Sequence, residues 1–138
     1  MLLKFKLAST VTLFFTISVA LAQGKMTPEQ VVQQNLDYYN ARDIEGFMAS
    51  FSNDIALYTF PESQPHTVGL EAVRKLYTEL FALSPKLHST ILTRIVFDNK
   101  VIDHESIVGR RGSADIFEIV MIYEVKDDKI VRMTAIRK

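Results

Sequence analysis

Apolar residues in the first part of the chain recur every three or four positions, a spacing typical of amphipathic helices. Val32, Leu36 and Tyr39 form one such stripe and predict a helix over residues 28–40. Thr27 precedes the stripe within the residue pattern of a capping box, which marks the start of a helix.

Two further helices and one strand are expected next. Asp43 is a cap residue for a short helix over 44–51, where the apolar positions again lie on one side. Residues 54–60 alternate and predict a strand, which a Pro-flanked loop closes. Helical spacing returns over 70–84 and stops at Pro85, so a third helix is expected there.

The period of the pattern changes to two in the last part of the chain, which is typical of β-strands. Four strands are expected, over residues 87–97, 101–108, 115–125 and 130–137. Their connections are short, so consecutive strands are expected to be antiparallel neighbours. The pattern predicts an α+β fold in which three helices of the N-terminal half pack on one face of a curved antiparallel sheet.

The first 22 residues have the three parts of a secretory signal peptide. Lys4 and Lys6 give a basic start, an apolar run follows over 7–19, and Ala20–Ala22 is a small-x-small cleavage site. A membrane-spanning helix is the alternative, but this run is short for one and is interrupted by Ser and Thr. We therefore predict cleavage, a single mature domain over 23–138 without a membrane segment, and secreted or periplasmic localisation.

The amino-acid composition limits the chemistry of the chain. Its 138 residues include 16 Lys plus Arg, 16 Asp plus Glu, three His and no Cys. Balanced charge without basic tracts argues against nucleic acid as a partner. The lack of Cys excludes disulfides and thiolate ligands, and three scattered His do not predict a metal site. We expect no cofactor, so any chemistry must come from carboxylates, Tyr, His, Arg and hydroxyl groups.

The order of the elements and four segments of sequence carry a family resemblance. The segments are Tyr39–Phe47, Phe51–Asp54, Gly69–Arg74 and Val101–Glu105. They resemble the nuclear transport factor 2-like superfamily, in particular its SnoaL-like and steroid-isomerase-like members, over residues 27–138. The resemblance implies a cone, in which the sheet wraps over three helices around an apolar pocket open at one end, and a homodimer formed through the sheet. The superfamily includes isomerases, hydratases, cyclases, epoxide hydrolases and proteins that only bind, so the resemblance names no reaction.

The resemblance also aligns this chain with the active-site residues of steroid isomerases. Thr59 corresponds to the aspartate that abstracts the proton, Asn35 to the tyrosine that binds the oxyanion, and Met121 to the protonated aspartate. All three family residues are absent. A Thr hydroxyl is too weak a base, and a Met thioether has no proton to donate. Ketosteroid isomerisation by the family's usual residues is therefore disfavoured.

Asp103 and Glu105 are the first catalytic candidates. They alternate onto the same side of one strand, about 6–7 Å apart, and the resemblance places that side in the pocket. In an apolar wall, one carboxyl would stay protonated as a general acid while the other acts as the base. The alternative is that one or both acids pair with Arg94, Arg132 or Arg137 in a solvated or interfacial cluster.

His104 lies between the two acids and is the second catalytic candidate. On this register its side chain points to the outer face of the sheet. A slip of one residue would exchange the roles, so that His104 faces the pocket as a base and Asp103 lies at the surface.

Four further residues are candidates for ligand binding. Thr59 and Met121 occupy positions that the resemblance places in the pocket. Tyr39 lies at the apolar edge of the first helix and can offer a hydroxyl, although aromatic residues at such spacing are more often core. Arg137 lies near the end of the last strand, where the mouth is expected, and can attract an anionic group; the alternative is an exposed charge beside Lys138.

Three functions are compatible with these observations. The first is a cofactor-free lyase or isomerase that acts on a small apolar or aromatic molecule through Asp103 and Glu105. The second is an exported binding protein whose pocket holds a ligand without chemistry. The third is an association module whose sheet face is the functional surface.

Overall fold

The computed structural model describes residues 24–138 of the chain. The predicted signal peptide, residues 1–22, lies outside the described residues. Within 24–138, no helix combines the length and the apolar character needed to cross a membrane.

Three helices form where the apolar spacing predicts them: α1 (Pro28–Ala41), α2 (Ile44–Ala49) and α3 (Leu70–Leu83). The capping box of α1 is present. Thr27 Oγ1 accepts a hydrogen bond from the Gln30 amide at 3.2 Å, and Gln30 Oε1 accepts one from the Thr27 amide at 2.9 Å. The Asp43 carboxylate accepts a hydrogen bond from the Gly46 amide at the start of α2. The side chains that cap α1 and α2 therefore define where both helices begin.

Six strands form one sheet in the order β2-β1-β6-β5-β4-β3. They are β1 (Phe51–Thr59), β2 (Thr67–Val68), β3 (His88–Phe97), β4 (Lys100–Val108), β5 (Phe117–Lys126) and β6 (Lys129–Arg137). The consecutive strands β3 to β6 are antiparallel neighbours, as their short connections predict. β1 lies parallel to β6, so the sheet is mixed at this junction. The sequence pattern did not predict the short strand β2.

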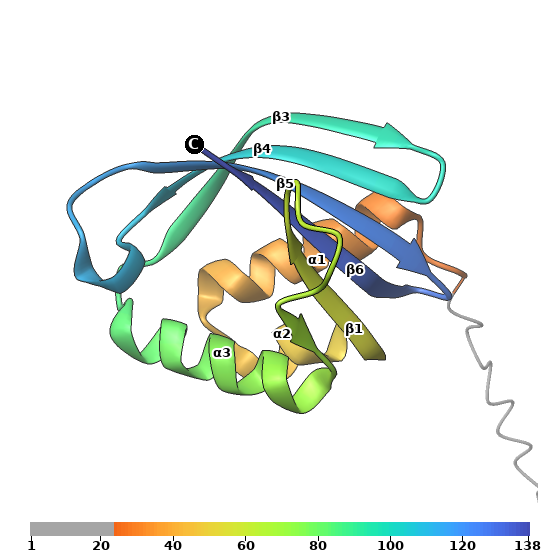
Figure 1. Cartoon of the computed structure of the whole chain (residues 1–138), viewed down its shortest axis with the longest axis horizontal. Coiled ribbons are helices and arrows are strands. Elements are labelled where there is room, and N and C mark those ends of the chain that lie inside the picture. The colour runs from red at the N-terminus through yellow and green to blue at the C-terminus, as the bar shows by residue number, and fades with distance from the viewer. Residues whose placement is uncertain (1–23) are drawn as a thin grey trace, which may run out of the picture.

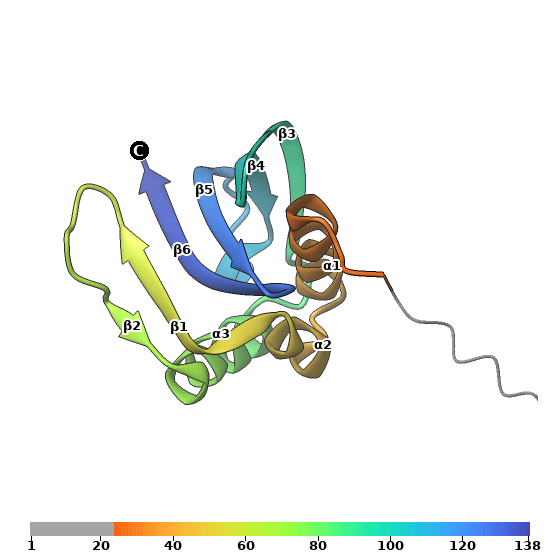
Figure 2. The ribbon, with the colours of Figure 1, turned by 90° about the vertical axis from the view of Figure 1, so that its right-hand side faces the viewer.

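The helices cover the concave side of the curved sheet (Figure 1, Figure 2). Phe47, Ile55, Val73, Val101 and Ile130 are almost completely buried in the core of the domain. Burial of apolar area between the helices and the sheet is the main favourable contribution to folding. The predicted α+β cone is confirmed.

The connection from β4 to β5 packs against the C-terminal end of α3. Gly109 has a φ of +70°, and a Cβ atom at this position would collide with the Lys86 backbone, so glycine alone permits the approach. A short 3₁₀ turn, η1 (Arg110–Gly112), follows. Its Arg111 amide donates a hydrogen bond to Ser84 Oγ at 2.8 Å. This connection is more compact than the simple turn that the sequence predicts, and it brings two arginines to the open end of the cone.

Candidate functional site

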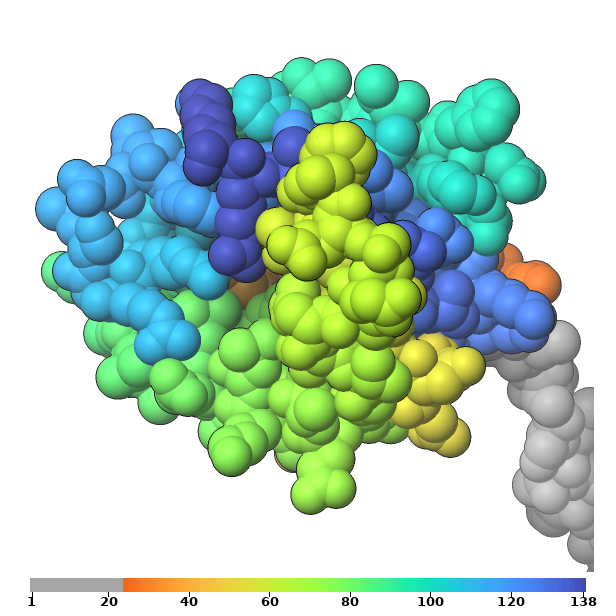
Figure 3. All heavy atoms as spheres, viewed as in Figure 1, coloured from red at the N-terminus to blue at the C-terminus, as the bar shows by residue number. Residues whose placement is uncertain are grey.

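A cavity of about 570 Å³ lies between α1, α3 and the concave face of the sheet. Its apolar wall includes Leu57, Leu80, Ile107, Ile119 and Met133. The loop between β1 and β2, the end of β6 and η1 contribute its outer residues. Figure 3 shows a hollow between the yellow-green loop, the dark-blue chain end and the light-blue segment around η1. A cavity of this size suits a small organic ligand.

Glu105 on β4 places a carboxyl group on the wall of this cavity, and only 4% of the residue's surface is exposed. Its two oxygens accept hydrogen bonds from the Ser89 hydroxyl at 2.7 Å and the Tyr123 hydroxyl at 2.9 Å. Burial raises the pKa of Glu105, and the two hydrogen bonds oppose part of that rise. The pKa of this carboxyl group is thus moved upward from its ordinary value, toward the pH at which the group can both take up and release a proton.

Ser89 is held in place from α1. The Asn40 side chain accepts a hydrogen bond from the Ser89 amide at 2.8 Å and donates one to the Ser89 carbonyl at 2.9 Å. Both amide atoms of Asn40 are used, so the backbone of β3 is tied to the helix at this point. The orientation of Glu105 therefore depends on α1 as well as on the sheet.

Asp103 lies on the same side of β4 as Glu105 but does not line the cavity. It is 1% exposed, and Arg94 donates hydrogen bonds to both of its oxygens, from Nε and Nη2, each at 2.7 Å. Arg94 also donates to Gln33 Oε1 on α1 at 2.8 Å. Asp103 thus takes the alternative role of an ion-paired acid, here buried, and the two carboxyls do not face the cavity as a pair.

His104 points to the other face of the sheet, as the alternation predicts. Its imidazole lies 3.4 Å from the Glu118 carboxylate, and it does not line the cavity. The pairing of β4 with β5 places Asp103 opposite Met121 and Glu105 opposite Ile119. The register therefore has the two acids inside and the histidine outside.

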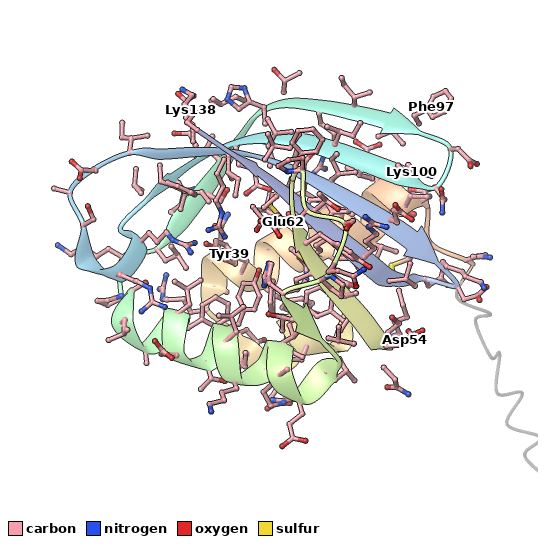
Figure 4. All side chains as sticks on the ribbon, viewed as in Figure 1. Tyr39, Asp54, Glu62, Phe97, Lys100 and Lys138 are labelled. Carbon is pink, nitrogen blue, oxygen red and sulfur yellow. The ribbon has the colours of Figure 1, made fainter. Side chains whose placement is uncertain are left out.

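The four residues expected to bind a ligand, Tyr39, Thr59, Met121 and Arg137, all line the cavity. Figure 4 shows Tyr39 in the space between the sheet and α3, and Glu62 on the loop that follows β1. Burial, together with the nearby Tyr77, raises the pKa of Tyr39 far above its ordinary value, and burial raises the pKa of Tyr77 to about 12. Both phenols consequently stay protonated and can donate hydrogen bonds into the cavity.

Sequence reasoning missed Arg110 and Arg111, which line the cavity from η1. It also missed the two hydrogen-bond donors to Glu105. Two adjacent arginines between two glycines are a recognisable local signal in the sequence. Their position at the cavity depends, however, on how the β4–β5 connection folds against α3. Within residues 24–138, the side chains of His, Asp and Glu form no group of three that could hold a metal ion.

The stability of the fold should decrease as the pH rises through the folded-state pKa of Glu105. Because burial raises this pKa above that of the unfolded chain, the folded state binds more protons between the two values, so the free energy of unfolding falls with pH there. Each unit of difference corresponds to about 1.4 kcal/mol. The Glu105→Gln variant should lose this dependence, so its stability relative to the wild type should increase as the pH rises above 4.5, measured by thermal unfolding.

The matched control for this measurement is Glu118→Gln on the outer face. Lys138 and His104 lower the pKa of Glu118, so the difference between this variant and the wild type should change with pH in the opposite direction. A constant stability difference between Glu105→Gln and the wild type across the pH range would contradict the raised pKa.

The fold and the cavity define a class of protein: an α+β cone with a small-molecule pocket and a buried carboxyl group in its wall. Sequence comparison agrees, because the model of the SnoaL-like domain family matches residues 32–133. The chain belongs to this family. No curated protein matches the sequence closely enough to count as a relative.

Solved structures show the same fold at low sequence identity. A cystatin-fold protein from Novosphingobium aromaticivorans is 23% identical, with a TM-score of 0.73 over 81% of this chain and 99% of the other. A Kribbella flavida protein provisionally named a ketosteroid isomerase is 15% identical, with a TM-score of 0.68 over 80% and 77%. TerC, crystallised with polyporic acid, is 16% identical, with a TM-score of 0.68 over 80% and 91%. The family match and these neighbours agree on the α+β cone as the fold of the chain.

Proposed function

We propose that this protein is a cofactor-independent isomerase or lyase that transfers a proton on a small apolar or aromatic molecule, with Glu105 as the acid/base group. The observation that carries the proposal is a buried carboxyl, that of Glu105, with a raised pKa in the largely apolar wall of a 570 Å³ cavity. The SnoaL-like family and the structural neighbour provisionally named a ketosteroid isomerase support this class of reaction.

The proposed step is proton abstraction from a carbon next to a carbonyl group. The Glu105 carboxylate takes the proton, and the electron pair of the C–H bond moves onto the carbonyl oxygen to give an enolate. Glu105 then returns the proton to the same carbon or, in an unsaturated substrate, to a more distant one. No electrons leave the substrate, so neither an oxidant nor a reductant is needed.

Tyr39 and Tyr77 are the proposed donors to the enolate oxygen. Both line the cavity, and both phenols remain protonated because burial raises their pKa values. The residues aligned with the steroid-isomerase site, Thr59, Asn35 and Met121, also line the cavity. In this proposal the base comes instead from β4.

Deuterium exchange in D₂O, followed by NMR with enolisable aryl ketones such as 1-tetralone, tests the proposal. The wild type should accelerate exchange at the carbon next to the carbonyl, and Glu105→Gln should lower the rate by about 10²- to 10⁴-fold. Glu118→Gln, which changes an outward-facing carboxylate beside His104, should keep the wild-type rate. Exchange no faster than in buffer for the whole panel, or equal in Glu105→Gln and the wild type, contradicts the acid/base role.

Ligand binding without chemistry is the second candidate. It is favoured by the two hydrogen bonds from Ser89 and Tyr123, which already occupy both oxygens of Glu105. Native mass spectrometry would then find a co-purified molecule that is released unchanged. An association module would be favoured by a pocket filled with side chains. The structure has an open cavity instead, so this third function is not favoured. Export and the homodimer stay predictions.

A further inference from the structure

Arginine side chains from two separate segments lie at the outer part of the cavity. Arg110 and Arg111 come from η1, and Arg137 comes from the end of β6. All three line the cavity, so their positive charge is directed at whatever the cavity holds. The apolar wall described above lies deeper in the same space.

In the described part of the chain, two of these arginines have no carboxylate partner. Arg111 pairs with Glu79 at 3.1 Å. Within residues 24–138, Arg110 and Arg137 form no ion pair, whereas Arg94 and Arg74 each do. A guanidinium group without a carboxylate partner at the rim of a cavity is available to an acidic ligand.

Arg110 is held in position by its surroundings. Its guanidinium carbon lies 5.4 Å from the centre of the Phe117 ring, in a cation–π arrangement. The preceding Gly109 fixes the turn against Lys86, as described above. The guanidinium group therefore does not need to be ordered when a ligand arrives, which lowers the entropic cost of binding.

The acids that line the cavity do not cancel this charge. Glu62 lies on the loop after β1 and is exposed to solvent. Glu105 is buried on β4, and its hydrogen-bond partners are Ser89 and Tyr123 rather than an arginine. The positive charge reaches the interior, because Arg110 and Arg137 both oppose the rise in the pKa of Tyr77.

We propose that the ligand of this cavity is an amphipathic carboxylate, whose acid group binds Arg110 and Arg137 at the mouth while its apolar body fills the inner part. This inference rests on the proposed function of the cavity as the site for a small apolar molecule. A carboxylate matches the planar fork of a guanidinium group and can accept two hydrogen bonds from it. The pose directs the apolar body of the molecule toward Glu105 and away from the charged rim.

Isothermal titration calorimetry with a matched pair of probes tests the inference. The probes are 4-(2-naphthyl)butanoate and its primary amide, which have the same apolar body and differ in charge. The wild type should bind the acid at least tenfold more tightly than the amide. Added salt should lower the affinity for the acid but not the affinity for the amide. Arg110→Met and Arg137→Met should each lower the affinity for the acid about tenfold and leave the affinity for the amide unchanged.

Two further variants separate a local effect from a general one. Arg74→Met removes an arginine of α3 that pairs with Glu45 and does not line the cavity, and it should bind both probes like the wild type. Arg110→Lys keeps the charge without the fork, so its affinity for the acid should lie between those of the wild type and Arg110→Met.

The outcomes distinguish this inference from the function on which it rests. Equal binding of acid and amide to the wild type, or equal weakening of both probes by the arginine variants, overturns the carboxylate inference and leaves the apolar cavity as a ligand site. Failure of both probes to bind at millimolar concentration overturns the inference together with that site. Selective binding of the acid without ketone exchange upholds the carboxylate inference and removes the acid/base role of Glu105.

Discussion

Replacing Arg94 with Met should lower the free energy of unfolding by about 3–5 kcal/mol. Asp103 is 1% exposed, and Arg94 supplies hydrogen bonds to both of its oxygens at 2.7 Å. Without the guanidinium group, a carboxylate would remain buried with no compensating charge, and its desolvation would no longer be offset. Urea unfolding at neutral pH, followed by circular dichroism, measures the loss.

The double variant Arg94→Met/Asp103→Leu tests whether the loss comes from the orphaned charge. It should regain most of the stability, because both charged groups are removed together and replaced by apolar side chains. The control Arg74→Met breaks an exposed ion pair with Glu45 at 2.6 Å, and its unfolding midpoint should stay close to that of the wild type. A double variant no more stable than Arg94→Met would show that lost packing, rather than charge, dominates.

Phe47→Ala should destabilise the protein by about 3–5 kcal/mol and lower the affinity of the cavity for every ligand. Phe47 is 1% exposed, and its ring lies within 6.0 Å, centre to centre, of the rings of Tyr39, Phe51, Tyr77 and Phe81. Removing the Phe47 ring leaves an empty space in the aromatic cluster, so Tyr39 and Tyr77 lose a packing neighbour and can move. Thermal unfolding and calorimetry with the naphthyl probes measure the two effects.

Phe97→Ala is the matched control, because it removes the same kind of ring from an exposed position instead of a buried one. Phe97 is 73% exposed at the end of β3 and projects away from the sheet (Figure 4). Its loss should change neither the unfolding temperature nor the affinity for the probes appreciably. If Phe47→Ala were as mild as Phe97→Ala, the aromatic cluster would not be the support of the cavity.

Most of the fold could be predicted from the sequence, because its local signals and its tertiary structure agree. Thr27 and Asp43 mark the starts of α1 and α2 through caps that involve only neighbouring residues. The alternation along β4 correctly separates Asp103 and Glu105 from His104, since a strand has a fixed period of two. The parallel pairing of β1 with β6 could not be predicted in this way, because it joins segments far apart in the sequence.

The candidate site was only partly predictable. The sequence by itself determined that Asp103 and Glu105 share one side of β4, and the family resemblance supplied the direction of that side and the positions of Thr59 and Met121. These two residues line the cavity, as do the other two ligand candidates, Tyr39 and Arg137.

Only the tertiary structure decided that Asp103 binds Arg94 and that, of the two acids on β4, Glu105 is the one that faces the cavity. It also decided that the arginines of η1 reach the same space. The physical reason is that the period of a strand sets the direction of a side chain, whereas burial, ion pairing and a shifted pKa depend on partners brought from other elements by the fold.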